Sequence, residues 1–278
     1  MDRIAVGVDG SPPSESALQW AAVEAEYHDA SVLAVMAWGL LDQHHADQSD
    51  TFSPGYGPGE AREALRLNVE RAGVARPVEQ QEICDLPMKA LLTASVGADL
   101  LVVGARGLGG FKGLLLGSVS EQVLQHSTCP VAVVRCETRK HPDGPIVVGV
   151  DDSPGAIRAL RWAAAEAGAR GAELHVIHAW QAPAHVLPSS TKLLQSLRES
   201  ADAVLQAVMD DPAVSEVKLE ARLERSGAAQ ALIRGAAGAS LIVIGSHDTG
   251  RLHKALLGST SRQLAHHAPC PLVVVPAR

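Results

Sequence analysis

The chain has 278 residues, enough for two domains of ordinary size, and its 24 basic and 31 acidic residues give a formal net charge of −7. This balance leaves no basic stripe to neutralise a phosphate backbone, so we expect no nucleic-acid partner. No apolar run approaches the roughly 20 residues that cross a bilayer, and a strand-like segment starts at Ile4, so we expect a cytoplasmic protein without a membrane partner.

Apolar runs and helical patterns alternate along the first half of the chain. The patterns predict helices over residues 14–28, 60–72, 87–96 and 118–126. They predict strands over residues 4–9, 31–38, 78–83, 100–104 and 131–135. Such alternation implies a parallel sheet with right-handed crossovers and helices on both faces. The predicted fold class is therefore α/β.

The chain contains a long internal repeat. Residues Ile4–Trp38 recur without a gap as Ile146–Trp180, and about half of the aligned residues are identical. Residues Leu100–Val134 reappear as Leu241–Val275, with the register shifted by one residue. A whole domain has therefore been duplicated. We expect domains over residues 1–136 and 145–278, joined by a polar stretch.

Two segments are expected to meet at the ligand-binding edge of the first sheet. In a doubly wound sheet this edge lies beyond the carboxyl ends of the strands, where the winding direction switches. One segment is the turn Asp9-Gly10-Ser11, and the other is the glycine-rich loop from Gly104 to Gly117, after which Ser118 opens a helix. Glycines let main-chain amides approach an anion, and a helix start adds unpaired N–H groups. The pattern indicates a phosphate site.

Simpler interpretations of the same residues exist. The glycines can merely shape a long surface loop, Ser118 can cap its helix, and Asp9 can cap the helix that follows the first strand. The loop is not a P-loop, because it has no Gly-Lys-Ser/Thr sequence. Its position after a strand and before a helix favours phosphate binding.

The loop also resembles a known signature. Its spacing of Gly104, two residues, Gly107, nine residues and Gly117-Ser118 resembles the ATP-binding signature of the universal stress protein family, as do the opening VGVDGS and the closing CPVAVV. The resemblance covers nearly the whole chain twice, as in the tandem-domain type. It implies two doubly wound five-stranded parallel sheets similar to the adenine nucleotide alpha hydrolases, a fold that binds ATP or does not according to the sequence of this loop.

The resemblance implies a role for each residue of the first-domain site. Asp9 is expected near the ribose or a phosphate-bound Mg²⁺. Ala34 or Val35 is expected against the adenine, and Val103 beside the base. Loop amides and the hydroxyls at the helix start are expected to hold the phosphates. The predicted set is Asp9, Gly10, Ser11, Ala34, Val35, Val103, Gly104, Gly107, Gly117, Ser118, Val119 and Ser120.

The second domain departs from this pattern at one position. Asp248 stands where the first domain has Gly107, and a carboxylate there repels phosphate while its Cβ penalises positive φ. Arg251, His253 and Lys254 follow and supply compensating charge. We therefore expect ATP in the first domain, with a weaker or empty site in the second. The predicted second-domain contacts are Asp151, Gly245, Gly258, Ser259, Thr260 and Ser261.

The predicted function is that of a regulatory ATP-binding protein and not an enzyme. The loop lacks a P-loop lysine and a base to orient water, so we expect slow hydrolysis at most. Two alternatives remain open: a nucleotide-free scaffold, and an ATP-using adenylating enzyme with a second substrate at the loop Gly39–Gly59. From the resemblance, we expect the last strands, 131–135 and 272–276, to pair the two domains within one chain. A homodimer is also expected.

The cysteines and histidines predict no metal site of their own. The four cysteines have no CxxC spacing, and Cys129 and Cys270 are expected as small buried thiols. The histidine pairs at 44–45 and 266–267 are adjacent in sequence, so their side chains point apart.

Overall fold

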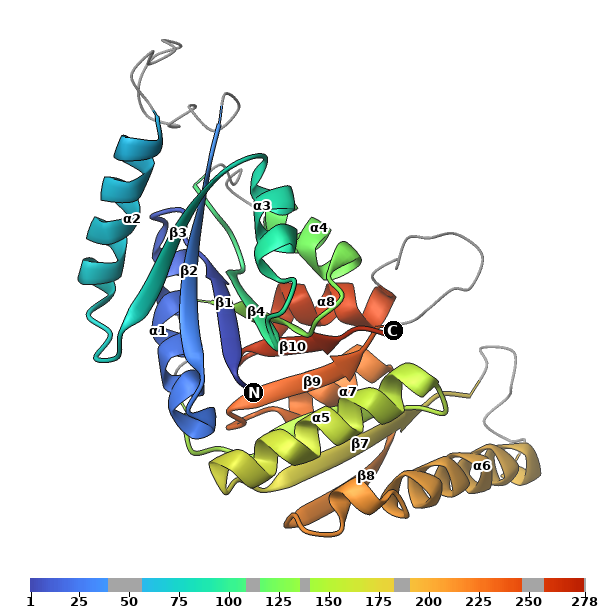
Figure 1. Cartoon of the computed structure of the whole chain (residues 1–278). Coiled ribbons are helices and arrows are strands. Elements are labelled where there is room, and N and C mark those ends of the chain that lie inside the picture. Colours follow the sequence, from blue (N-terminus) through green and yellow to red (C-terminus); the bar gives the residue numbers. More distant parts are fainter. Residues whose placement is uncertain (40–56, 109–115, 136–140, 183–190, 247–257, 278) are drawn as a thin grey trace. The chain divides into compact units, whose positions relative to one another are not determined.

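The computed structural model describes residues 1–39, 57–108, 116–135, 141–182, 191–246 and 258–277 (Figure 1). The chain divides into two compact units, Met1–Thr138 and Arg139–Arg278. The described residues of each unit form five parallel strands connected by helices. Most of the predicted loop Gly39–Gly59 and the position of Asp248 lie outside the described residues.

Unit 1 is a doubly wound sheet in the strand order β3-β2-β1-β4-β5 (Figure 1). All of its strand pairs are parallel. Helices α1 and α2 contact each other, as do α3 and α4, and the change of winding direction puts the two pairs on opposite faces. The elements are β1 Arg3–Gly7, α1 Pro12–His28, β2 Ser31–Trp38, α2 Pro58–Ala72, β3 Val78–Cys84, α3 Pro87–Ala94, β4 Leu100–Gly104, α4 Ser118–His126 and β5 Val131–Val134.

Unit 2 repeats the arrangement with the strand order β8-β7-β6-β9-β10. These strand pairs are also parallel. The elements are β6 Ile146–Val150, α5 Pro154–Arg170, β7 Leu174–Trp180, α6 Thr191–Met209, the 3-10 helix η1 Pro212–Val214, β8 Leu219–Arg225, α7 Ala228–Gly235, β9 Leu241–Gly245, α8 Ser259–His267 and β10 Leu272–Val275. The predicted α/β class with two five-stranded parallel sheets is confirmed.

The strands at the centre of each sheet have apolar side chains on both faces. Every residue of β4 is buried, and Leu100 and Leu101 are fully buried. In unit 2, Leu241 and Ile242 of β9 are fully buried as well. A parallel strand that is covered on both faces reads as a continuous apolar run. Each such side chain stabilises the fold by about 1.5–3 kcal/mol relative to its exposed state.

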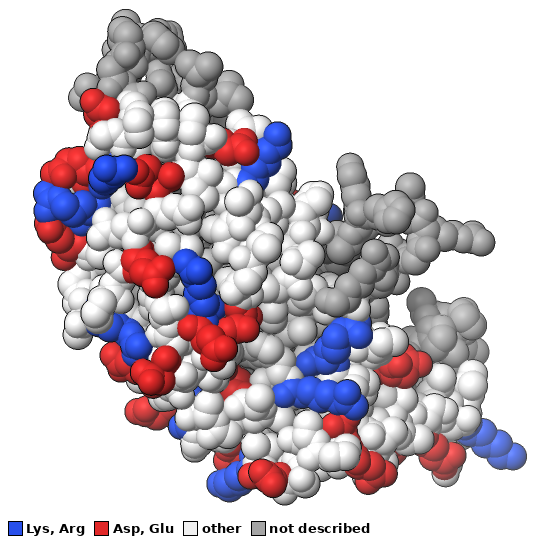
Figure 2. Space-filling model, in the orientation of Figure 1, with Lys and Arg blue, Asp and Glu red and all other residues white. Residues whose placement is uncertain are grey.

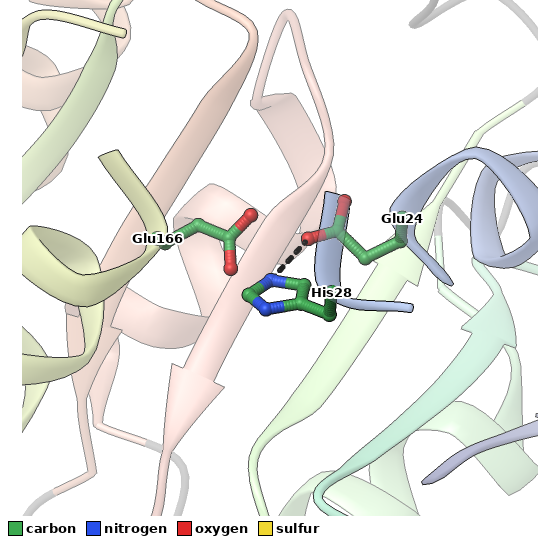
Figure 3. A group of neighbouring side chains, drawn as sticks. All are labelled: Glu24, His28 and Glu166. Carbon is green, nitrogen blue, oxygen red and sulfur yellow. Dashed lines mark ion pairs between the residues drawn. The ribbon is translucent and has the colours of Figure 1, made fainter. Parts of the chain in front are cut away.

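Two helices carry a buried acid at the same position of the repeat. Glu24 on α1 and Glu166 on α5 have side chains 1% and 0% exposed. His28 Nε2 lies 3.7 Å from Glu24, and Figure 3 marks this pair with a dashed line. Arg170 Nε lies 2.5 Å from Glu166. A buried charge is costly without a partner. In both units the partner is supplied one turn further along the helix, by Arg170 in unit 2 and in unit 1 by His28, which is a cation only when protonated.

The predicted boundaries differ from the structure at the first turn. The strand expected to end at Asp9 ends at Gly7, and the helix expected from Ser14 begins at Pro12. Ser11 is the N-cap of α1, and proline suits the first helical turn because it lacks the N–H that would have no partner there.

Two further expectations concern the thiols and the membrane. Cys129 and Cys270 are buried, as predicted, and burial raises the pKa of the Cys270 thiol to about 12. Among the described helices, none combines the length and the apolar character that crossing a bilayer requires.

Candidate functional site

The carboxylate of Asp9 joins the two segments that were expected to form the site in unit 1. Its Oδ1 accepts hydrogen bonds from the amide and the hydroxyl of Ser11, at 3.0 and 2.6 Å. Its Oδ2 accepts from the amide of Leu108 in the glycine-rich loop, at 3.0 Å. The hydroxyl of Ser11, in turn, accepts from the amide of Ser14 at 3.3 Å. Ser11 therefore caps α1, and the interpretation of Asp9 as a plain helix cap is wrong.

Two glycines of the loop lie in close contacts within the protein itself. A Cβ on Gly107 would lie 2.3 Å from Asp9 Oδ2. A Cβ on Gly104 would lie 2.7 Å from the carbonyl carbon of Pro13, at the start of α1. In unit 2 a Cβ on Gly245 would lie 2.4 Å from the main chain of Gly155. The strand end therefore needs glycine in both units to let a helix start approach, whether or not a ligand binds.

The start of α4 presents main-chain amides close to these glycines. Gly117 is the N-cap residue and provides no side-chain cap, while its own amide donates to Ala105 at 2.7 Å. The interpretation of Ser118 as the helix cap is therefore wrong. Ser118 is exposed. Ser120 is 4% exposed, and its hydroxyl donates to the carbonyl of Gly104 at 2.7 Å. The first-turn amides have no acceptor within the helix, as at every helix start.

Basic residues follow the two neighbouring strands β4 and β5. Arg106 and Arg135 lie near enough for Arg106 to affect the titration of Arg135. Burial lowers the pKa of the Arg135 guanidinium, and the charge of Arg106 lowers it further. Two cations thus gather at the edge where the glycine-rich loop begins. Such a pair favours an anion at that edge.

Helix α2 steadies the turn between β1 and α1. Arg71 donates to the carbonyl of Gly10 at 3.1 Å and to the side-chain oxygen of Asn68 at 2.6 Å. It also lies 2.9 Å from Glu15 on α1. Gly10 has a φ of 84°, which favours glycine because a side chain is strained there.

The residues predicted to contact adenine are buried. Ala34, Val35 and Val103 are 0%, 1% and 3% exposed. The structure brings Asp9, Gly107 and the start of α4 together at the surface: a Cβ on Gly117 would lie 3.6 Å from the amide nitrogen of Gly107. The three apolar residues lie within the sheet, and almost none of their surface is accessible to a ligand.

The corresponding edge of unit 2 keeps part of this arrangement. Asp151 Oδ1 accepts from the amide of Ser153 at 3.0 Å, and Ser153 caps α5 through the amide of Ala156 at 3.2 Å. Ser259 and Thr260, at the start of α8, line an open pocket of about 810 Å³ that extends to the start of α7. Like Ser120 in unit 1, Ser261 is buried, and Gly258 is the N-cap residue of α8. The partner loop, with Asp248, is outside the described ranges.

Sequence reasoning missed an ionic cluster on β7 and β8. His175 Nε2 lies 3.5 Å from Glu220 and 3.9 Å from Glu173. Lys218 lies 3.1 Å from Glu173, and Arg222 lies 2.7 Å from Glu220. The two carboxylates are already neutralised by these cations, which makes the cluster a surface salt-bridge network. Only the pairing of the two strands reveals it.

Acidic and basic side chains are intermixed on the face that Figure 2 presents. On α2, Arg66 forms ion pairs with Glu63, at 2.6 Å, and with Glu70. Arg62 on the same helix pairs with Glu82 of β3. In these pairs each positive side chain lies beside a negative one, so the described part of this surface has no large patch of a single sign.

Taken together, the duplicated doubly wound units and the glycine-rich edge define a tandem α/β protein with a candidate anion site in unit 1. The model of the family described as "Universal stress protein family" matches residues 1–135 and 144–276. The chain therefore belongs to the universal stress protein family, and the resemblance seen in its motifs is confirmed.

Relatives of similar length support this assignment. A universal stress protein of Mycolicibacterium smegmatis is 31% identical, over 99% of this chain and 97% of its own length. A universal stress protein of Mycobacterium tuberculosis is 30% identical, over 98% and 96%. The crystal structure of a universal stress protein from Archaeoglobus fulgidus covers 99% of this chain and 98% of its own, with a TM-score of 0.65 and 22% identity. This last likeness concerns the fold alone.

Proposed function

We propose that this chain is an ATP-binding universal stress protein, a regulatory module of the cytoplasm whose first unit holds the nucleotide. The observation that carries the proposal is the contact between Asp9 and the loop at Gly107 and Leu108. This contact fixes the beginning of the glycine-rich loop beside the first turn of α4. Main-chain amides held in place before binding lose little conformational entropy when an anion binds.

The phosphates are proposed to lie at the start of α4. The amides of Ser118 and Val119 have no intrahelical acceptor, and the exposed Ser118 hydroxyl adds a donor. Arg106 and Arg135 add positive charge at the same edge. The hydroxyl of Ser120 is already bound to Gly104, so we assign it a structural role and remove it from the phosphate contacts.

Asp9 is proposed to face Mg²⁺ that accompanies the triphosphate. Its exposed carboxylate fits a hard cation, because Mg²⁺ in nucleotide sites is bound by phosphate oxygens and one or two carboxylates. A bound Mg²⁺ would neutralise the repulsion between Asp9 and the phosphates. Ala34, Val35 and Val103 are buried. The adenine can therefore contact them only if the residues that cover them move apart.

We propose regulation and not turnover as the output. The sequence has no P-loop lysine, and both carboxylate oxygens of Asp9 already accept hydrogen bonds from Ser11 and Leu108 instead of orienting a water. A conformational or partner-binding change on ATP binding is the output that remains. We expect ATP hydrolysis well below the ordinary enzyme range, which starts at about 1 per second.

Titration calorimetry with ATP and Mg²⁺ tests the proposal on three forms of the chain. The wild type should bind ATP, Gly107→Asp should lose the site of unit 1, and Asp248→Gly should gain affinity or stay unchanged. Gly59→Asp is the matched control, because a Cβ at the exposed Gly59 meets nothing within 4 Å. An acid is also tolerated in the first turn of a helix.

The other outcomes identify the alternatives. No binding by the wild type would favour the nucleotide-free scaffold. Equal binding by wild type and Gly107→Asp would place the site elsewhere and contradict the proposal. Release of pyrophosphate from ATP with a cosubstrate would favour the adenylating enzyme instead.

A further inference from the structure

Unit 2 has a second open pocket, at the carboxyl ends of β7 and β8. Its volume is about 470 Å³, within the range of roughly 300–1,000 Å³ that is usual for small-molecule sites. Helix α6 forms one wall, since α6 contacts both strands, and Figure 1 shows it beside β8. The lining residues are Trp180, Leu194, Gln195, Arg198, Leu223 and Arg225.

Two guanidinium groups border the half-buried indole of this pocket. The guanidinium carbon of Arg225 lies 5.5 Å from the centre of the Trp180 ring, a cation–π distance. Arg198 has a counterion in Asp202, at 3.8 Å, but both side chains are more than half exposed and the pair is weak. Glu224 points to the other face of β8 and pairs with Arg234, at 3.5 Å. Glu199 of α6 accepts a hydrogen bond from the lining residue Gln195, at 2.9 Å, so a carboxylate also lies at the α6 wall, while the charge over the indole itself is that of Arg225.

The equivalent place in unit 1 has the opposite charge pattern. Trp38 of β2 corresponds to Trp180 in the repeat and pairs with Cys84 of β3, whereas Trp180 pairs with Arg225. Two residues earlier, Glu82 of β3 is replaced by Leu223 of β8. Unit 2 has thus lost an acid and gained a base at this strand end.

In unit 1 the carboxylate of Glu82 also neutralises the neighbouring cation, Arg62. Arg62 of α2 donates its Nε–H to Glu82 at 2.9 Å, and this contact lowers the pKa of the Glu82 carboxyl. In unit 1 the charges of Arg62 and Glu82 therefore neutralise each other at this position. In unit 2 the apolar Leu223 stands in place of this carboxylate, and Arg198 of α6 keeps only its weak, exposed pair with Asp202.

We propose that unit 2 binds a small aromatic anion in this pocket, with its ring against Trp180 and its acidic group between Arg198 and Arg225. The apolar side chains of Leu194 and Leu223 favour a ring over a hydrated inorganic ion. Guanidinium groups form paired hydrogen bonds with carboxylate, sulfonate or phosphate. The proposal is independent of the nucleotide site in unit 1.

Titration calorimetry with three probes tests the proposal: naphthalene-2-sulfonate as aromatic anion, 2-naphthylmethanol as neutral aromatic, and sulfate as ring-free anion. The aromatic anion should bind best, and added NaCl should weaken its binding. Arg225→Gln and Arg198→Gln should each weaken binding about ten- to hundredfold, the usual range for one charge-assisted hydrogen bond. Trp180→Leu should weaken it as well.

The control variants lie in unit 1 and should bind the aromatic anion like the wild type. Arg62→Gln tests the equivalent place, and Gly107→Asp tests the proposed ATP site, so that the two proposals fail separately. The inference is overturned if naphthalene-2-sulfonate binds more weakly than about 1 mM. It is also overturned if both arginine variants bind it like the wild type, or if Gly107→Asp abolishes binding.

Discussion

The carboxylate of Asp9 lies so close to Gly107 that a Cβ on residue 107 would stand 2.3 Å from Oδ2. Next to this glycine, Oδ2 accepts a hydrogen bond from the amide of Leu108. Oδ1 accepts one from the amide of Ser11 at the start of α1. A strand end, a helix start and a loop 99 residues later are thereby joined through one side chain. The site depends on these hydrogen bonds of Asp9, because they fix the position at which the glycine-rich loop begins.

Gly107→Ala should disturb this joint without adding charge. The new Cβ would push Asp9 away from Leu108, and we expect a loss of about 1 kcal/mol in the free energy of unfolding, the usual net value of one hydrogen bond. ATP affinity should fall as well. Urea unfolding and calorimetry measure the two effects. Gly59→Ala is the control, and equal stability of the two variants would contradict the geometry at Asp9.

Asp9→Asn should weaken the loop contact while keeping the shape of the side chain. The substituted amide has only one acceptor oxygen, so it cannot accept from Ser11 through one oxygen and from Leu108 through another, as the carboxylate does. Hydrogen exchange of the Leu108 amide should become faster, and ATP binding should weaken. Asp151→Asn in unit 2 is the matched control. Unchanged exchange at Leu108 would show that this amide does not depend on Asp9.

Arg170→Ala should destabilise unit 2 strongly. It removes the cation from Glu166, whose side chain is 0% exposed, and breaking a buried pair usually costs about 3–5 kcal/mol. The double variant Glu166→Gln, Arg170→Met should recover part of the loss, because no unpaired charge remains. Chemical unfolding of the three forms checks this. A double variant less stable than Arg170→Ala would contradict the argument.

The carboxyl of Asp211 should contribute stability that is lost in acid. The amide of Ala213, together with Arg161, holds the pKa of Asp211 below its ordinary value. The pKa of Asp211 is lower in the folded state than in the unfolded chain, where it is about 3.9. The stabilisation is therefore complete when the pH is above the unfolded pKa. It disappears as the pH falls through the folded pKa. Asp211→Asn should therefore flatten the pH dependence of unfolding below about pH 5, by less than about 1 kcal/mol. A steeper dependence in the variant would contradict this assignment.

Local sequence patterns predicted the central strands well. Ser31–Trp38 and Leu100–Gly104 have the expected bounds, because a strand buried on both faces leaves a continuous apolar run. The start of α1 was misjudged because its cap, Ser11, precedes two prolines that look like a turn. Local patterns therefore locate the elements better than their ends.

Long-range contacts explain what the sequence did not reveal about the site. The partner of Asp9, Leu108, is 99 residues away, and no local pattern links the two. The pocket at Trp180 depends on the register between β7 and β8, which brings Arg225 beside the indole. Burial of the predicted adenine contacts, such as Val35, also follows only from the packed sheet.

The most direct test of the central claim is a nitrogen-15 NMR titration of the chain with ATP and Mg²⁺. The claim is that main-chain amides at the loop and the start of α4 hold the triphosphate. It predicts that the amide signals of Gly107, Gly117, Ser118 and Val119 shift with ATP concentration, and more than those of Gly258 and Ser259. Unshifted signals from the four unit 1 amides at saturating ATP would contradict it.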